Sequence, residues 1–446
     1  MAKIVLIGSN HAGIAAANTL LGNYPGNELV IIDRNTNVSY LGCGTALWIG
    51  RQVKGYDALF YTSKADIEAL GAKFHMETEV ESIDFANRIV HAKGKAGNAI
   101  DESYDKLILA TGSLPITPNI PGIGLENVEY VKLFQDGQQI DAILEDPAVK
   151  NVAVVGAGYI GVEIAEAVKR RGKNALLFEA LDTSLAAYYD PWFTGDMDKI
   201  LSDNGVELHF NEKLNTIAGE GGKAVAVETD KGKYPAELVI LSIGFRPNNA
   251  LGKDHLELFA NGAYLTDRCQ RTSDPAVFAV GDCATVWNNA TDQRAYIALA
   301  TNAVRSGIVA GHNVGGTAIE TQGVQGSNGI CIFNYKMVST GLNLAAAKKA
   351  GIDAAHTDFE DLQKPGFIES DNHKVKIRVI YDRKSRRIIG AQMASYNDIS
   401  MGIHMFSLAI AKKVTIEELA LLDIFFLPHF NQPYNYITMA AISAKD

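Results

Sequence analysis

Lys3-Ile-Val-Leu-Ile-Gly8-Ser9-Asn10-His11-Ala12-Gly13 opens the chain, and a related stretch, Val152-Ala-Val-Val-Gly156-Ala157-Gly158-Tyr159-Ile160-Gly161, follows later. In each, an apolar strand runs into a glycine-rich turn and then a helix. Such a turn places a pyrophosphate at a helix N-terminus, where backbone N–H groups point at the anion. The first copy departs from the pattern at Asn10, where a middle glycine is expected. Two copies predict two dinucleotide sites in one protein.

An acidic residue ends the second strand of each unit. Asp33 follows Leu29-Val30-Ile31-Ile32, and Glu179 follows Ala175-Leu-Leu-Phe178. A carboxylate at this position accepts hydrogen bonds from an adenosine ribose. We therefore expect Glu179 to bind the 2′-hydroxyl of NADH and to repel the 2′-phosphate of NADPH, although use of both coenzymes stays open.

Three further strand ends carry glycine turns. Thr111-Gly112 follows the strand Leu107-Ile108-Leu109, Gly244 follows Leu238-Val-Ile-Leu-Ser-Ile, and Gly281-Asp282 follows Val277-Phe-Ala-Val. Taken alone, Asp282 fits a turn former or a helix cap as well as a ligand. We predict that these residues contact a cofactor, together with Ile160 and Ala298.

The bulk composition excludes several classes of protein. Of the 446 residues, 47 % are hydrophobic and 21 % charged, and the net charge is -10. These values are typical of a soluble globular protein and argue against nucleic acid or an anionic membrane as a partner. We find no run of eighteen apolar residues, and a strand begins within three residues of the N-terminus, so we expect a cytoplasmic protein without a signal peptide. Cys43, Cys269, Cys283 and Cys331 show no zinc spacing, and no metal site is predicted.

These signals predict an α/β fold with two Rossmann-like dinucleotide-binding domains and a C-terminal α+β dimerisation domain. The proline-rich passage Pro115 to Pro121 reads as a crossover, and alternating strands such as Lys374 to Tyr381 follow residue 321. We expect residues 1–118 and 247–320 to form the two parts of the first domain. Residues 119–246 then form the second domain, and residues 321–446 form the C-terminal one.

The order of these landmarks resembles the flavoprotein disulfide reductase superfamily, along essentially the whole chain. The resemblance implies a glutathione-reductase-like fold with FAD at the first fingerprint (Gly8, Asn10, Gly13 and Asp33) and NADH at the second. It also implies that Asp282 holds the ribityl chain of the flavin. By the same resemblance the last quarter forms the interface of a homodimer, and the aromatic run Phe425 to Phe430 reaches the partner.

Cys43, in Tyr40-Leu41-Gly42-Cys43-Gly44, indicates the redox chemistry. Glutathione-reductase-type enzymes carry two cysteines near this loop. Here no second cysteine is nearby, and the positions five residues before and after Cys43 hold Val38 and Trp48. A single thiol can cycle between thiolate and sulfenic acid or form a mixed disulfide with a small thiol. The flanking glycines argue against an inert core cysteine, and a helix starting at this point would lower the pKa of the thiol.

His11 indicates the subfamily. On its own, His11 could equally well be a helix cap or a hydrogen-bond partner of the backbone as a functional residue. Together, Ser9 to Gly13 and Ser39 to Gly44 resemble the NADH oxidase and NADH peroxidase subfamily, which implies that His11 lies beside Cys43 and stabilises its sulfenate. Members usually carry Ser where Gly42 stands. Coenzyme A disulfide reductases share the single cysteine but generally lack the histidine.

The stretch Cys43-Gly44-Thr45-Ala46-Leu47-Trp48-Ile49-Gly50 is more similar to water-forming oxidases than to peroxidases. The resemblance thus favours reduction of O2 to water by two NADH, with reduction of hydrogen peroxide or coenzyme A disulfide as alternatives. A flavin-bound redox sensor without turnover is a further alternative. The resemblance also implies that Tyr159 covers the flavin until nicotinamide displaces it, although Tyr159 could instead pack against Phe245.

Overall fold

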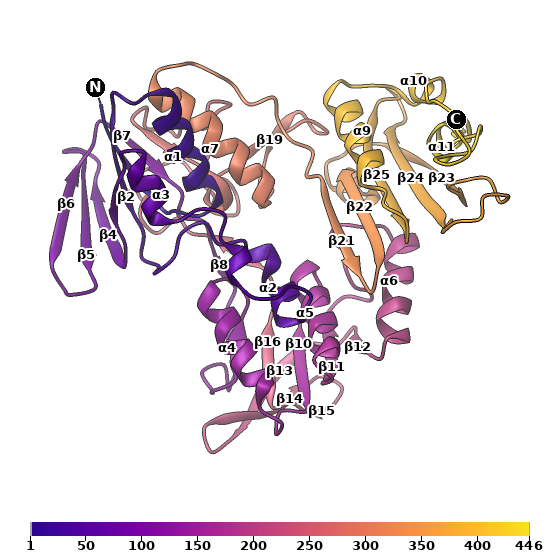
Figure 1. Cartoon of the computed structure of the whole chain (residues 1–446), viewed down its shortest axis with the longest axis horizontal. Coiled ribbons are helices and arrows are strands. Elements are labelled where there is room, and N and C mark those ends of the chain that lie inside the picture. The colour runs from indigo at the N-terminus through magenta and orange to yellow at the C-terminus, as the bar shows by residue number, and fades with distance from the viewer. Residues whose placement is uncertain (1, 446) are drawn as a thin grey trace.

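The computed structural model describes residues 2–445, and its core consists of three five-stranded sheets (Figure 1). The first sheet is parallel, and the strand of the first fingerprint is its central strand. Its order is β18 (Val277–Ala279), β7 (Lys106–Leu109), β1 (Lys3–Ile7), β2 (Glu28–Ile32) and β3 (Lys73–His75).

The second sheet repeats this design around the second fingerprint and is also parallel. The fingerprint strand is again central, in the order β12 (Glu207–Phe210), β11 (Asn174–Glu179), β10 (Asn151–Val155), β16 (Leu238–Leu241) and β9 (Val128–Tyr130).

Both central strands are apolar throughout because both of their faces are buried. Ile4 and Leu6 pack toward helices α1 (His11–Asn23) and α7 (Ala300–Gly315). Val5 and Ile7 face the opposite core, which residues of the three-stranded meander β4–β6 complete. The meander strands are β4 (Thr78–Asp84), β5 (Ile89–Gly94) and β6 (Ala99–Ser103). In the second unit, helices α4 (Phe134–Glu145), α5 (Tyr159–Arg170) and α6 (Pro191–Asp203) cover one face, and β13 (Leu214–Glu220), β14 (Lys223–Thr229) and β15 (Lys233–Pro235) cover the other.

The third sheet is antiparallel and lies at the C-terminal end of the chain (Figure 1). Helices α9 (Ser400–Ala411), α10 (Ile416–Ala420) and α11 (Tyr436–Ile442) pack on it. The strand order is β21 (Asn328–Ile332), β22 (Tyr335–Gly341), β25 (Ile388–Ser395), β24 (Lys374–Asp382) and β23 (Ala354–Leu362). The predicted fold class is therefore confirmed, while the residue limits given for the domains stay predictions.

The chain leaves the first sheet after β7 and returns to it with β18. At this crossing β8 (Ser113–Pro115) pairs antiparallel with β17 (Phe245–Pro247), so the outgoing and returning segments lie side by side. Within residues 2–445 we find no helix long and apolar enough to cross a membrane.

Each position of the second fingerprint holds glycine for a different physical reason. Gly156 has a φ of +99°, which favours glycine. A Cβ on Gly161 would lie 1.8 Å from the carbonyl oxygen of Gly156, so α5 packs directly on the turn. A Cβ on Gly158 would meet nothing within 4 Å. Gly158 thus leaves space at the cavity, whereas Gly161 holds the fold.

The structure of the first fingerprint explains why Asn10 can stand where the middle glycine is expected. Gly8 has a φ of +105°, and a Cβ on Gly13 would lie 2.0 Å from the carbonyl oxygen of Gly8. Position 10 corresponds to Gly158, where there is room for a side chain. Asn10 stands there as the exposed N-cap residue of α1 in an extended conformation.

We predict opposite effects for two alanine substitutions in the second fingerprint. Gly161→Ala forces α5 away from β10 and should lower the unfolding temperature by several degrees or prevent folding, because the backbone contact cannot relax. Gly158→Ala should melt like the natural protein but bind NADH more weakly. Thermal unfolding and an NADH titration of both variants measure this, and equal unfolding temperatures would contradict it.

Candidate active site

One cavity of about 1450 Å³ joins the two fingerprints. It is lined by residues from both parallel sheets and by Asn328 and Gly329 of the C-terminal sheet. Of the residues predicted to bind a cofactor or act in catalysis, Gly161 alone is not among its lining residues, because it lies beneath the turn. The predicted residues that line the cavity are Gly8, Asn10, His11, Gly13, Asp33, Cys43, Thr111, Gly112, Gly156, Gly158, Tyr159, Ile160, Glu179, Gly244, Gly281, Asp282 and Ala298.

The part of the cavity beside the turn from Gly8 to Gly13, here called the first arm, fits a dinucleotide. The N-terminus of α1 opens into it, and a Cβ on Gly8 would lie 2.3 Å from the carbonyl oxygen of Ala110, so no side chain fits at this point of the turn. Asp33 accepts hydrogen bonds from the backbone N–H (2.6 Å) and hydroxyl (2.7 Å) of Ser9. It also accepts from the backbone N–H of Asn35 at 2.8 Å, so of its roughly four acceptor sites about one remains for a ribose hydroxyl while it holds the turn.

The part of the cavity beside the turn from Gly156 to Gly161, here called the second arm, has the same construction, with Glu179 as its acidic residue. One carboxylate oxygen of Glu179 accepts a hydrogen bond from the N–H of Ala157 at 2.8 Å, and the other accepts from the N–H of Leu181 at 3.0 Å. Glu179 therefore lies at the end of β11 with its negative charge against the glycine turn. This position suits recognition of a ribose next to a pyrophosphate.

Cys43 lies where the two arms meet. It belongs to a short 3₁₀ turn, Gly42–Gly44, that leads directly into α2 (Thr45–Ile49). The Thr45 hydroxyl donates to the carbonyl oxygen of Gly42 at 2.7 Å and holds this turn. The thiol is open to the cavity, as the flanking glycines indicated. By contrast, Cys283 is fully buried in the core.

The expected lowering of the Cys43 pKa is wrong for this structure. Protein atoms crowd the thiol on most sides, and this desolvation raises its pKa, with the nearby carboxyl of Glu163 adding to the effect. The helix that follows is only five residues long, so its dipole is too weak to reverse the result.

His11 is the first residue of α1 and stacks on Tyr61. The ring centroids are 5.7 Å apart with an interplanar angle of 4°, and Nδ1 lies 3.2 Å from the Tyr61 hydroxyl. Burial raises the pKa of Tyr61 to about 12, so this hydroxyl keeps its proton and can donate it to Nδ1. The imidazole proton then sits on Nε2. Burial also lowers the pKa of His11, which keeps the ring neutral at neutral pH.

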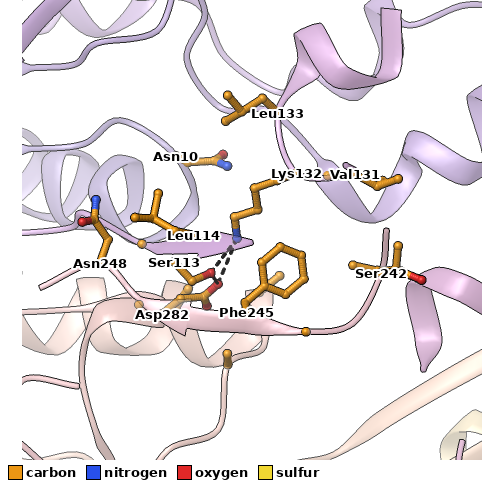
Figure 2. Close-up of a pocket in the computed structure, with 18 of the residues that line it drawn as sticks. Asn10, Ser113, Leu114, Val131, Lys132, Leu133, Ser242, Phe245, Asn248 and Asp282 are labelled. Carbon is orange, nitrogen blue, oxygen red and sulfur yellow. Dashed lines mark hydrogen bonds and ion pairs between the residues drawn. The ribbon is translucent and has the colours of Figure 1, made fainter. Parts of the chain in front are cut away.

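Lys132 is a site residue that sequence reasoning missed (Figure 2). Its ammonium donates to the Ser113 hydroxyl at 2.8 Å and lies 3.3 Å from the carboxylate of Asp282. It also lies 4.7 Å from the centre of the Phe245 ring. Lys132 stands just after β9 in no recognised motif, so no sequence signal pointed to it. It is the cation that neutralises Asp282 inside the cavity.

Glu163 was also missed, although the sequence carried a signal for it. It lies four residues after Tyr159 on α5, and residues at this spacing share a helix face. Both side chains line the cavity. Burial raises the pKa of Glu163 to about 7, and the neighbouring Glu166 contributes. The carboxyl is therefore poised to gain or lose a proton near neutral pH.

Tyr159 stands at the start of α5 with its ring 4.3 Å from that of Tyr188. Its hydroxyl bonds the amide oxygen of Asn328 and lies 3.0 Å from the Tyr189 hydroxyl. Phe245, its alternative packing partner, instead lies under the ammonium of Lys132.

Two dinucleotide turns that share a cavity with an accessible thiol define a class of redox proteins. The chain belongs to the pyridine nucleotide-disulphide oxidoreductase family: the family model matches residues 2–307, and the model of its dimerisation domain matches residues 327–435. An NADH oxidase of Lactococcus lactis is 59 % identical over 445 residues, which cover 99 % of this chain and 100 % of that protein.

Solved structures agree with this assignment. The chain is similar to a water-forming NADH oxidase from Lactobacillus brevis solved with NADH bound, with a TM-score of 0.96 and 36 % identity over 99 % of this chain and 98 % of that one. It is also similar to an NAD-dependent persulfide reductase from A. fulgidus, with a TM-score of 0.95 and 26 % identity over 99 % and 82 % of the two chains. The fold is thus shared by proteins of different activities.

We predict that Glu163→Gln changes how stability depends on pH. A carboxyl whose pKa is raised in the folded state stabilises the fold while both states are protonated, and this contribution is lost as the pH rises from about 4.5 to about 7. Glutamine does not titrate. Between pH 5 and pH 8.5 the natural protein should therefore lose about 2 kcal/mol of unfolding free energy that the variant does not lose.

Urea unfolding of the FAD-free protein at the two pH values measures this difference. Glu369→Gln, which changes an exposed carboxyl, is the control and should follow the natural protein. A Glu163→Gln variant with the same pH dependence as the control would rule out a raised pKa at Glu163.

Proposed function

We propose that the chain is an FAD-dependent NADH oxidase that reduces O2 to water with two NADH per O2. The observation that carries the proposal is the placement of Cys43, His11 and both dinucleotide turns on a single cavity. The 59 % identity to an NADH oxidase, over nearly the whole of both chains, supports it.

FAD would be held in the first arm by the turn from Gly8 to Gly13, with Asp33 at its ribose and Asp282 at its ribityl chain. When bound, it supplies two-electron exchange with NADH and reactivity toward O2. Lys132 would then contribute positive charge beside Asp282. NADH would lie on the turn from Gly156 to Gly161, with its adenosine ribose at Glu179.

Cys43 completes the reduction. Oxidation of one NADH by O2, with uptake of one proton, yields NAD+ and hydrogen peroxide. The Cys43 thiolate attacks one peroxide oxygen, the O–O bond breaks, and the second oxygen leaves as hydroxide, which takes up a proton to become water. Two electrons from a second NADH and two protons, one of them from the medium, then convert the sulfenic acid back to a thiol and release the second water.

His11 and Glu163 would manage the protons of this cycle. Neutral His11 can donate its Nε2 proton to the departing oxygen while Nδ1 takes the proton of the Tyr61 hydroxyl, and solvent then returns a proton to Tyr61. Glu163 has a pKa of about 7 and lines the same cavity, so it can exchange protons with solvent at neutral pH. Both side chains are neutral or half-protonated at rest, which suits proton relay.

The alternative enzymes differ only in the acceptor, whereas a redox sensor would bind FAD but show no steady-state consumption of NADH. A peroxidase would share every Cys43 step but react poorly with O2, and a coenzyme A disulfide reductase would form a mixed disulfide at Cys43. We favour the oxidase because the Lactococcus lactis relative is named an NADH oxidase and the similar Lactobacillus brevis structure is of a water-forming NADH oxidase. The predicted cytoplasmic location stays a prediction.

We further propose a homodimer formed through the C-terminal domain. Phe425, Phe426 and Phe430 are 65 %, 47 % and 57 % exposed in one chain, and Leu421 is 88 % exposed. Such a contiguous apolar segment is typical of a protein interface. Light scattering should give twice the 48.1 kDa mass of one chain, and a monomer at micromolar concentration would contradict the proposal.

We predict that Cys43→Ser still consumes NADH and O2 but releases hydrogen peroxide, because serine cannot reduce it. In an oxygen electrode the ratio of NADH to O2 consumed should fall from about two to about one, and catalase should return oxygen. Cys331→Ser, which removes an exposed thiol not among the cavity-lining residues, is the matched control and should keep the natural ratio. A Cys43→Ser variant that releases no peroxide would show that Cys43 has no redox role.

A further inference from the structure

A single amide oxygen gathers the hydroxyl groups around Tyr159. Oδ1 of Asn328 accepts from the Tyr159 hydroxyl, from the Ser339 hydroxyl at 3.0 Å and, more weakly, from the Tyr189 hydroxyl at 3.4 Å. The orientation of the amide is fixed, because Nδ2 of Asn328 donates to the carbonyl oxygen of Gly326 at 2.7 Å. A flipped amide would set two carbonyl oxygens against each other.

This acceptor has more donors than it needs. A carbonyl oxygen has two lone pairs, and three hydroxyl groups point to it. If Tyr159 moves away, Ser339 and Tyr189 can still satisfy Oδ1, so no buried acceptor is left without a partner. Departure of Tyr159 therefore costs its own hydrogen bonds to Asn328 and to the Tyr189 hydroxyl, 3.0 Å away, and not the larger penalty of an orphaned buried group.

The surroundings of this oxygen are rigid. Asn328 and Ser339 are register partners in the antiparallel pair β21–β22. Tyr189 is followed by Asp190, a buried carboxylate that lies 3.1 Å from the guanidinium of Arg378 and accepts from the amide of Gln392 at 2.9 Å. The C-terminal sheet thus anchors both partners of Tyr159, whereas Tyr159 itself belongs to α5 and lines the cavity.

We propose that Asn328 is a positioning residue that holds Tyr159 closed over the nicotinamide side of the cavity. Asn328 and Tyr159 both line that cavity, and the strength of their hydrogen bond sets the threshold for entry of the coenzyme. This inference rests on the proposed function, in which nicotinamide displaces Tyr159. The C-terminal domain then has a part in coenzyme binding within its own chain.

A double-mutant cycle tests the inference. Tyr159→Phe removes the donor and keeps the ring, while Asn328→Leu removes the acceptor at similar size. Each should tighten binding of NAD+ to the oxidised, FAD-loaded protein by about 2- to 10-fold, because closure then gains fewer hydrogen bonds. The double variant should bind no more tightly than Tyr159→Phe alone, since that change already removes both bonds of the hydroxyl. Calorimetric titration with NAD+, which involves no turnover, measures these values.

Ser327→Ala is the matched control. It removes a hydroxyl one residue before Asn328, bonded to Thr340 at 2.8 Å, and should leave NAD+ binding unchanged. Unchanged affinity in Tyr159→Phe and Asn328→Leu, or effects that multiply in the double variant, would overturn the proposal. If Asn328→Leu does not fold, Asn328→Ser serves in its place, since its hydroxyl is too short to reach Tyr159.

Two readouts separate this inference from the proposed oxidase activity. In the FAD-free protein, the losses of unfolding temperature in Tyr159→Phe and Asn328→Leu should not add, and additive losses would contradict a direct bond. NADH should bleach the flavin absorbance of the FAD-loaded protein without oxygen, at a lower NADH concentration in the single variants. A protein that is reduced in this way but consumes no O2 would refute the oxidase and leave Asn328 in its role.

Discussion

The contact between a glycine and a carbonyl oxygen beneath each fingerprint turn is the constraint on which this structure depends. Gly13 meets the oxygen of Gly8, and Gly161 meets that of Gly156, at distances that admit no side chain. These contacts seat α1 and α5 against their strands with their N-termini toward the cavity. The first residue of each helix is therefore delivered to the site, His11 by one and Tyr159 by the other. The backbone contact beneath each turn thus sets the positions of His11 and Tyr159 in the site.

The resting charges of the reactive groups in the cavity depend on residues from separate parts of the chain. Burial raises the pKa of Cys43 and lowers that of His11, so both groups are neutral at neutral pH. Lys132 and Asp282 form an ion pair beside them, so this ammonium and this carboxylate largely cancel. The Cys43 thiolate therefore has to form by transfer of the thiol proton to another group.

Much of the fold and part of the site could be predicted because their signals are local. Strand, glycine turn and helix lie within a dozen residues of each other, so both dinucleotide units could be recognised, and Cys43 and His11 lie in motifs of the same kind. Lys132 and Asn328 could not be predicted, because only tertiary packing brings them to the cavity from segments without a motif. Glu163 could have been found from its four-residue spacing to Tyr159. The lowered pKa of Cys43 was wrong because burial outweighs the dipole of a five-residue helix.

The hydrogen bond from Ala157 to Glu179 ties two properties of the protein together. The carboxylate that we propose discriminates between coenzymes also accepts from the glycine turn and holds its shape. Removing the acid to admit a 2′-phosphate therefore loosens the turn that must receive the pyrophosphate. A redesign toward NADPH needs a neutral acceptor in reach of the Ala157 N–H as well as a new cation, so coenzyme preference and preorganisation have to be engineered as a single unit.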